Sequence, residues 1–310
     1  MNRRNFMTKT TTLASVGLIA SMDNLTQNSF LDFEPAAGFS LKIFATNWGF
    51  VGNLYTFCAK AKSEGYDGIE VWWDTTKKGQ DELFTALKKY QLEVGFLVGG
   101  SENEAIKHFE TFKKNLLEAT AQTIQKPAYI NCHSGKDFFT YDENKTFIDL
   151  TTETHKKTGI PIYHETHRGR MLFAAHITKN FIDKNPDLRL TLDISHWTNV
   201  HESLLENQSE AVQAALERTS HIHTRIGHEE GPQVNDPRAP EWQNAVKAHL
   251  GWWDKVVEMK MKTGQSLTML TEFGPPSYLQ TLPFTNLPVA NQWEINVYMM
   301  KLMRERYLKK

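Results

Sequence analysis

The chain has 310 residues, 40% of them hydrophobic and 23% charged, which is the composition of an ordinary globular protein long enough for one large barrel or two smaller domains. The formal net charge of -1 provides no basic surplus to neutralise a phosphate backbone, so nucleic acid is not the expected partner. The two cysteines, Cys58 and Cys132, provide neither a disulfide framework nor a Cys-x-x-Cys zinc motif.

The first residues of the chain resemble a signal for export. Arg3 and Arg4 precede Phe6, and a modest apolar run follows at residues 13–22, which is too short to span a bilayer. Paired arginines before an apolar run are typical of a twin-arginine signal. We therefore predict a signal and linker over residues 1–36, a periplasmic mature protein and no membrane segment. A disordered basic tail is the alternative interpretation.

After residue 36, apolar strands and amphipathic helices alternate eight times with no change in composition. Strands are predicted over residues 40–48, 68–73, 92–99, 128–132, 160–165, 190–193, 220–226 and 267–272. Helices are predicted over residues 53–63, 81–90, 102–122, 142–157, 171–184, 209–217, 241–261 and 289–307. Such alternation implies parallel strands joined by crossover helices, and eight repeats close a barrel.

The predicted fold class is therefore α/β, a single (β/α)8 TIM barrel over residues 37–310. A doubly wound open sheet is the competing architecture, but the Gly-x-Gly-x-x-Gly phosphate turn of such sheets is absent. In a TIM barrel the chemistry lies at the C-terminal ends of the strands. Candidate functional residues should accordingly follow the predicted strands.

Four strands each carry one potential metal ligand at this end, namely Glu165, Asp193, His223 and Glu272. One carboxylate after a strand is more often a helix cap or an ion-pair partner. Four ligands at the same end of four consecutive strands favour a metal site. The mixed oxygen and nitrogen shell suits one divalent cation, with Mn2+ or Co2+ favoured and Mg2+ or Zn2+ as further candidates.

Further polar and aromatic residues are expected around the same rim as substrate contacts, namely His133, His167, Arg168, His196, Arg225 and Trp48. The arginines can bind hydroxyl or carboxylate groups, and surface ion pairs are the alternative for them. His196 could also be a ligand of a second metal or the start of a helix. His221 lies one layer deeper than His223, which favours a hydrogen-bonded core role. Of Trp72 and Trp73, which are adjacent, one must face the helices and belong to the core.

These motifs resemble the xylose-isomerase-like barrel superfamily of sugar isomerases and epimerases, which also contains the endonuclease IV type enzymes. The resemblance covers nearly all of the chain from Ser40 onward, and its most specific parts are YHETHRGR at 163–170, LDISHW at 192–197, HIHTR at 221–225 and TEFGPP at 271–276. It implies that one divalent metal is bound by Glu165, Asp193, His223 and Glu272. It also implies that His196 contacts the substrate.

The chain departs from this superfamily in the loop at residues 227–237, which lacks the arginine that ketose epimerases have after the histidine of strand seven. The substrate could therefore differ from a free ketohexose. The loop also lacks the Asp-x-His that helps endonuclease IV to build a three-metal site. This second departure argues against a nuclease.

The expected function is a metal-dependent isomerase or epimerase that acts on a keto-sugar or a related polyol or sugar acid. Glu165 and Glu272 are the expected acid/base pair, working through a metal-stabilised enediolate. A keto-sugar or keto-inositol dehydratase or lyase on the same site is one alternative, and a barrel that only binds sugar is another. A small carbohydrate is the expected partner, and a homo-oligomer is left open.

Overall fold

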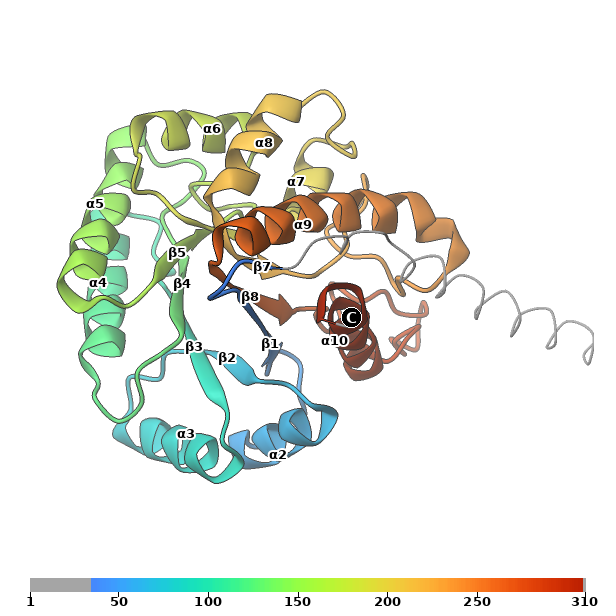
Figure 1. Ribbon diagram of the computed structural model, residues 1–310, viewed down its shortest axis with the longest axis horizontal. Coiled ribbons are helices and arrows are strands. Elements are labelled where there is room, and N and C mark those ends of the chain that lie inside the picture. Colours follow the sequence, from blue (N-terminus) through green and yellow to red (C-terminus); the bar gives the residue numbers. More distant parts are fainter. Residues whose placement is uncertain (1–34, 309–310) are drawn as a thin grey trace, which may run out of the picture.

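Eight parallel strands close on themselves in sequence order, with β8 hydrogen-bonded back to β1. The structure is a computed structural model that describes residues 35–308 (Figure 1). The strands are β1 Ser40–Thr46, β2 Gly68–Trp72, β3 Glu93–Gly99, β4 Tyr129–His133, β5 Ile162–Glu165, β6 Leu190–Leu192, β7 Thr219–His223 and β8 Ser266–Thr271. The predicted TIM barrel is confirmed. The predicted signal and linker cover residues 1–36, of which all but the last two lie outside the described residues.

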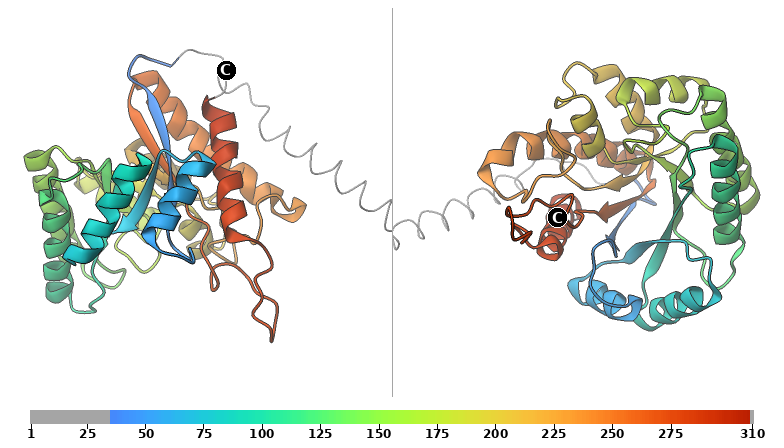
Figure 2. Two further views of the ribbon diagram at one scale, coloured as in Figure 1. Left: turned by 90° about the horizontal axis from the view of Figure 1, so that it is seen from below. Right: turned by 180° about the vertical axis from the view of Figure 1, so that it is seen from behind.

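Helices surround the barrel on its outer face, as Figures 1 and 2 show from three sides. They are α2 Leu54–Glu64, α3 Lys77–Tyr90, α4 Ala105–Ala121, α5 Tyr141–Thr158, α6 Ala175–Lys184, α7 Ser195–Val200, α8 Ser209–Arg218, α9 Gln243–Thr263 and α10 Gln292–Leu308, with a 3-10 turn η2 at Pro240–Trp242. Their apolar faces and the outward strand residues form the main hydrophobic core. Within residues 35–308, no helix has the length and apolar character needed to cross a membrane.

Inside the barrel, a second, smaller apolar cluster of Phe44, Tyr129 and Leu270 forms a floor one layer below the inward residues Thr46, Asn131 and Glu272. Two glycines make room for its rings. A Cβ atom on Gly68 would lie 2.4 Å from the Phe44 ring, and one on Gly95 would lie 2.4 Å from the Tyr129 ring. Because side chains alternate along each strand, the inward residues above this floor are those that follow Phe44 and Tyr129 in steps of two.

The sixth strand is shorter than predicted, because β6 ends at Leu192 and Asp193 begins a turn. The Asp193 carboxylate accepts a hydrogen bond from the Ser195 backbone N–H at 3.2 Å, and the short helix α7 starts there. His196 therefore lies in the first turn of a helix, which is one of the roles that the sequence left open for it. The helix that was predicted over residues 171–184 is α6, which starts at Ala175. The residues before Ala175 are not helical, and the Leu172 carbonyl accepts a hydrogen bond from Trp197 Nε1 at 3.0 Å.

Candidate metal centre and substrate cavity

The C-terminal ends of β5, β6, β7 and β8 bring together the four predicted ligands. One donor atom from each of them lies within 4.8 Å of the other three, and all four side chains are buried; the residues are Glu165, Asp193, His223 and Glu272. Two ligands on opposite sides of an ion, each about 2.0 to 2.3 Å from it, lie about 4.0 to 4.6 Å apart. The spacing of this cluster therefore suits a single cation.

His223 lies at the centre of the cluster. Its Nδ1 atom is 2.9 Å from Glu272 Oε2 and 3.8 Å from Glu165 Oε1. Burial opposes a charge on this ring, but Glu272 and Glu165 outweigh burial and raise the pKa of His223 well above its ordinary value. Groups that attract a proton this strongly to a buried nitrogen would attract a metal cation to the same place.

A residue that the sequence analysis did not single out, Glu70 of β2, faces the other nitrogen of His223. Glu70 Oε1 is 3.6 Å from His223 Nε2, and Asn131 Nδ2 is 3.3 Å from the same nitrogen. Burial would raise the pKa of Glu70, but hydrogen bonds with His221 and His223 lower it to about 2. A carboxylate on the far side of a ligating imidazole fixes the ring orientation and leaves Nδ1 for the metal.

His221 occupies the deeper layer that its position on β7 predicts. Its Nδ1 atom is 2.7 Å from Thr268 Oγ1, its Nε2 atom is 3.4 Å from Glu70 Oε2, and its ring lies against Tyr129 with centroids 4.2 Å apart. Burial lowers the pKa of His221. A continuous polar path therefore runs from Thr268 through His221 and Glu70 to His223.

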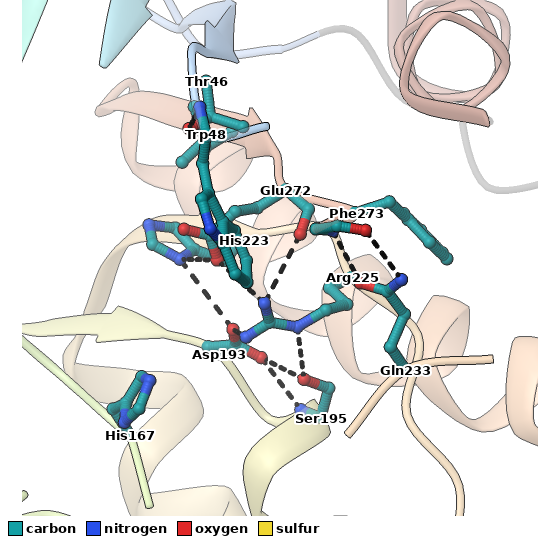
Figure 3. Close-up of polar contacts among 12 residues, drawn as sticks. Thr46, Trp48, His167, Asp193, Ser195, His223, Arg225, Gln233, Glu272 and Phe273 are labelled. Atoms are coloured by element: carbon teal, nitrogen blue, oxygen red, sulfur yellow. Dashed lines mark hydrogen bonds and ion pairs between the residues drawn. The ribbon is translucent and has the colours of Figure 1, made fainter. Parts of the chain in front are cut away.

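Arg225 enters the cluster from the segment that follows β7 and is almost fully buried. Its guanidinium donates to the Asp193 carboxylate, donates to Ser195 Oγ at 3.1 Å, and lies 3.4 Å from Glu272 Oε2 (Figure 3). The rings of Trp48 and Tyr278 cover it, with centroids 5.9 and 4.9 Å from its Cζ atom. Burial raises the pKa of Asp193 to about 6, although Arg225 acts in the opposite direction.

The charges of the cluster fit a divalent cation. Four buried carboxylates face a single buried guanidinium, which leaves an excess of three negative charges when all of them are ionised and His223 is neutral, as a metal ligand must be; the carboxylates are Glu70, Glu165, Asp193 and Glu272. Buried charge is unfavourable unless it is paired or coordinates a metal. A divalent cation would remove most of the excess, and the three carboxylates plus one imidazole of the candidate ligand set are donors that such cations accept.

His133 and His167 extend the cluster on the side of β4 and β5. His133 Nε2 lies 2.9 Å from Glu165 Oε2, which Asn131 Nδ2 also contacts at 2.8 Å. His167 Nδ1 bonds to the Arg168 carbonyl, so this nitrogen carries the proton and Nε2 is left as an acceptor. Burial and the neighbouring His133 lower the pKa of His167 to about 3.

Two of the predicted substrate contacts, His196 and Arg168, are not among the residues that line the cavity. The His196 ring is fully buried, 3.9 Å from the His167 ring between centroids, and its Nε2 atom is 2.8 Å from Arg225 Nη2. Arg168 donates to Asn199 Oδ1 at 3.1 Å and lies over the Tyr278 ring. Both residues thus contact groups that themselves line the cavity.

The cavity above the cluster has a volume of about 460 Å³ and combines acidic, basic and aromatic side chains. Its lining includes Thr46, Asn47, Trp48, Glu70, Trp72, His133, Glu165, His167, Arg170, Arg225, Glu272 and Tyr278. Trp72 is 53% exposed and faces the cavity, whereas its neighbour Trp73 is 8% exposed and packs against Phe96. The expectation that one of the two tryptophans belongs to the core is confirmed, and the core residue is Trp73.

The backbone is similar to several solved structures of enzymes. A 3-keto-D-glucoside 4-epimerase from E. coli is 14% identical, with a TM-score of 0.58 over 86% of this chain and 99% of that chain. A probable 3-DHS dehydratase, AsbF, from Bacillus anthracis is 15% identical, with a TM-score of 0.54 over 85% of this chain and 98% of that chain. A D-tagatose 3-epimerase-like protein gives 14% identity and a TM-score of 0.54, covering 86% and 98% of the two chains. The chain shares their fold.

The resemblance to xylose-isomerase-like barrels is therefore confirmed at the level of the fold. No protein-family model and no curated protein matches the sequence. Because one barrel fold hosts many different reactions, the function has to be argued from the site.

Proposed function

We propose that this protein is a divalent-metal-dependent carbohydrate isomerase or epimerase, acting on a keto-sugar or a related polyol or sugar acid by moving a proton next to a carbonyl group. The observation that carries the proposal is the convergence of four potential metal ligands beside an open cavity, namely Glu165, Asp193, His223 and Glu272. Proton transfer next to a carbonyl needs carboxylates on the reacting carbon and positive charge at the carbonyl oxygen, and this cluster can supply both.

Glu165 and Glu272 are the pair that we assign to proton transfer. Their carboxylates flank His223, 3.8 and 2.9 Å from its Nδ1 atom, so a substrate carbon between them could lose a proton to one and regain a proton from the other. Burial opposes ionisation of Glu165, but His133 and His223 lower its pKa well below the ordinary value. Glu165 is therefore a carboxylate at neutral pH and can accept a proton.

The four ligands would hold one divalent cation, for which the mixed oxygen and nitrogen donors favour Mn2+ or Co2+. When bound, such a cation would polarise the substrate carbonyl and stabilise the negative charge that develops on oxygen. Glu70 keeps the His223 ring oriented for this task. Arg225 holds the Asp193 carboxylate in position and compensates part of its charge.

The remaining cavity residues would bind the rest of the carbohydrate. Trp48 and Trp72 present ring faces at the rim, and sugars pack their C–H faces against aromatic rings. His167 offers Nε2 as an acceptor for a hydroxyl group. His196 acts through Arg225 in this proposal, because it does not line the cavity.

Two of the structural relatives bear the names of an epimerase and a dehydratase, and both activities support a search among keto-sugars. A dehydratase would begin with the same proton abstraction and would then expel a β-hydroxyl group. We place isomerisation or epimerisation first because no additional step is required of the cluster.

The test is mass spectrometry of a panel of sugars and keto-sugars incubated with metal-loaded protein in deuterated water. An isomer keeps the mass of the substrate apart from one incorporated deuterium, whereas a dehydrated product has lost water. Loss of water would reassign the reaction to a lyase. Tight sugar binding without any exchange in Mn2+, Co2+, Mg2+ or Zn2+ would reject the proposal in favour of a binding protein.

A further inference from the structure

Arg170 ends the motif that contains Glu165 and His167, and the proposed function gives it no role. Its backbone N–H donates to the His167 carbonyl at 3.1 Å, and Gly169 in this turn has a φ of 73°. Glycine adopts this left-handed conformation without steric cost. The turn brings Arg170 back to the cavity, where it is part of the lining together with Glu165 and His167.

Within the described part of the chain, no carboxylate forms an ion pair with the guanidinium group of Arg170. Its side chain makes one hydrogen bond among residues 35–308, from Nη1 to the Gly100 carbonyl at 3.3 Å, and no carboxylate oxygen of these residues lies within 4.0 Å of it. A guanidinium carries five N–H donors in a planar fork, so most of them lack a protein acceptor. Arg225, the other arginine of the cavity, has Asp193 and Glu272 beside it.

Two cationic side chains, Arg170 and Lys136, lie near each other on this side of the cavity. Burial lowers the pKa of Arg170, and the attraction of Glu165 and Asp137 from a distance does not offset this effect. Burial and the charge of Arg170 also lower the pKa of Lys136, so a second cation lies near the first. An anion that bound here would meet the Arg170 guanidinium, which belongs to the cavity lining and has N–H donors to spare, with the ammonium of Lys136 nearby.

We propose that Arg170 binds an anionic group of the substrate, so that the carbohydrate is a sugar acid or a sugar phosphate and not a neutral sugar. The planar fork of an arginine matches both a carboxylate and a phosphate. The inference rests on the proposed function, because it assumes that the cavity takes a carbohydrate.

The test measures binding of three unreactive probes by isothermal titration calorimetry: neutral D-glucitol, D-gluconate with a carboxylate, and D-glucitol 6-phosphate. None of them has a carbonyl group, so the outcome does not depend on turnover and stays separate from a failure of the proposed reaction. Titrations of metal-loaded and metal-free protein separate coordination of the probe to the metal from contact with Arg170.

We expect the full-length protein to bind one of the two anionic probes about 10- to 100-fold more tightly than D-glucitol, which is the factor expected for hydrogen bonds to a charged group. Arg170→Gln should abolish this preference and leave the affinity for D-glucitol unchanged. Arg170→Lys should keep part of it, since the charge remains but the fork is lost. A preference for gluconate assigns a sugar acid, and a preference for the phosphate assigns a sugar phosphate.

The matched control is Arg189→Gln, which removes the same charge outside the cavity, where Arg189 donates to the Pro186 and Leu188 carbonyls. This variant should bind all probes as the unmodified protein does. Equal loss of all three affinities in Arg170→Gln would mean a structural role and would overturn the inference. It would also be overturned if the unmodified protein prefers neither anion, or if Arg170→Gln keeps the preference. Arg170→Lys decides the question if the glutamine variant does not fold.

Discussion

The strand ends of the barrel differ in chemistry between its two halves. The four buried candidate ligands lie at or directly after the ends of β5 to β8, whereas the exposed rings of Trp48 and Trp72 lie after β1 and at the end of β2. The ligand half concentrates charge that has to be paired or coordinated. The aromatic half offers surface on which a sugar can pack. The proposed reaction thus separates into a reacting end held by β5 to β8 and a recognition end held by β1 and β2.

Glu70 is the exception that connects the two halves. It comes from β2, in the aromatic half, but its carboxylate faces His223 and His221 of β7. It lies one layer below the rim, where the strands are close enough for side chains to meet across the barrel. The buried carboxylates therefore differ in two ways, in the strand that carries them and in their depth below the rim of the barrel.

The largest effect should follow a change to the proton-transfer pair. Glu272→Gln retains an oxygen that can coordinate a metal but cannot accept a proton, so exchange of deuterium into the substrate should fall by about 100- to 10,000-fold with metal still bound in part. Metal content by mass spectrometry and exchange by NMR check this. Glu258→Gln on α9, an exposed pair with Lys262, is the control. Near-full exchange would limit Glu272 to a ligand role.

A smaller effect is expected from the residue that links the halves. Glu70→Gln keeps the shape of the side chain but weakens the bond that orients His223, so metal affinity should fall by about 10- to 100-fold, as for other partners of ligating histidines. Calorimetric titration with Mn2+ measures the affinity. Glu93→Gln, a partly exposed carboxylate on β3 paired with Lys42, should titrate like the unmodified protein. Equal affinities for both variants would remove Glu70 from the metal centre.

In the aromatic half, the neighbours Trp72 and Trp73 should respond in opposite ways. Trp72→Ala should raise KM by roughly 2- to 12-fold, the range for an aromatic contact of about 0.5 to 1.5 kcal/mol, with kcat and the free energy of unfolding nearly unchanged. Trp73→Ala should cost about 3 to 5 kcal/mol of stability, because its ring is buried. Steady-state kinetics and urea unfolding distinguish the two. Similar destabilisation by both changes would contradict the assignment of Trp72 to the cavity lining and of Trp73 to the hydrophobic core.

The smallest effect concerns the pH dependence of stability behind the ligand half. Burial lowers the pKa of His249 to about 4, and its Nε2 accepts from the Gly227 N–H at 3.2 Å. The unfolded chain protonates this ring below its ordinary pKa of about 6.5, whereas the folded chain does so only near 4. Stability should therefore fall as the pH decreases through this window, by up to about 1.4 kcal/mol per pH unit.

His249→Gln should remove this contribution and flatten the curve of unfolding free energy between pH 7 and pH 4, as urea titrations at several pH values would measure. The exposed His176→Gln serves as the comparison and should leave the slope unchanged. If the unfolding free energy depends on pH with the same slope in His249→Gln and in the unmodified protein, then other titratable groups cause the loss of stability in acid.

The ligand half could be predicted from the sequence, because a charged residue directly after an apolar strand stands out and the barrel fixes the end at which it lies. Glu70 was missed because it lies within a strand, between Ile69 and Val71. The sequence did contain an indication, however, because a carboxylate in a strand that is buried on both faces needs a polar or charged partner inside the barrel.

The place of Arg170 in the cavity was missed, and the helix α7 was only one of several alternatives for His196, for a different reason. The position of Arg170 depends on the left-handed turn at Gly169, and a glycine in a loop does not reveal which way the chain returns. α7 begins with a hydrogen bond to the Asp193 carboxylate, which the sequence analysis had interpreted as a ligand alone. Both features depend on local backbone geometry, which neither the period of apolar residues nor the number of strands determines.

The apolar floor of Phe44, Tyr129 and Leu270 lies beneath the candidate metal centre, and the cavity lies above it, with Glu165 and Glu272 in its lining. This arrangement bears on the order in which a cation and a carbohydrate would bind. A carbohydrate seated in the cavity would cover the cation beneath it. We therefore expect that the cation binds first and departs last, and that a saturating ligand slows its extraction by a chelator.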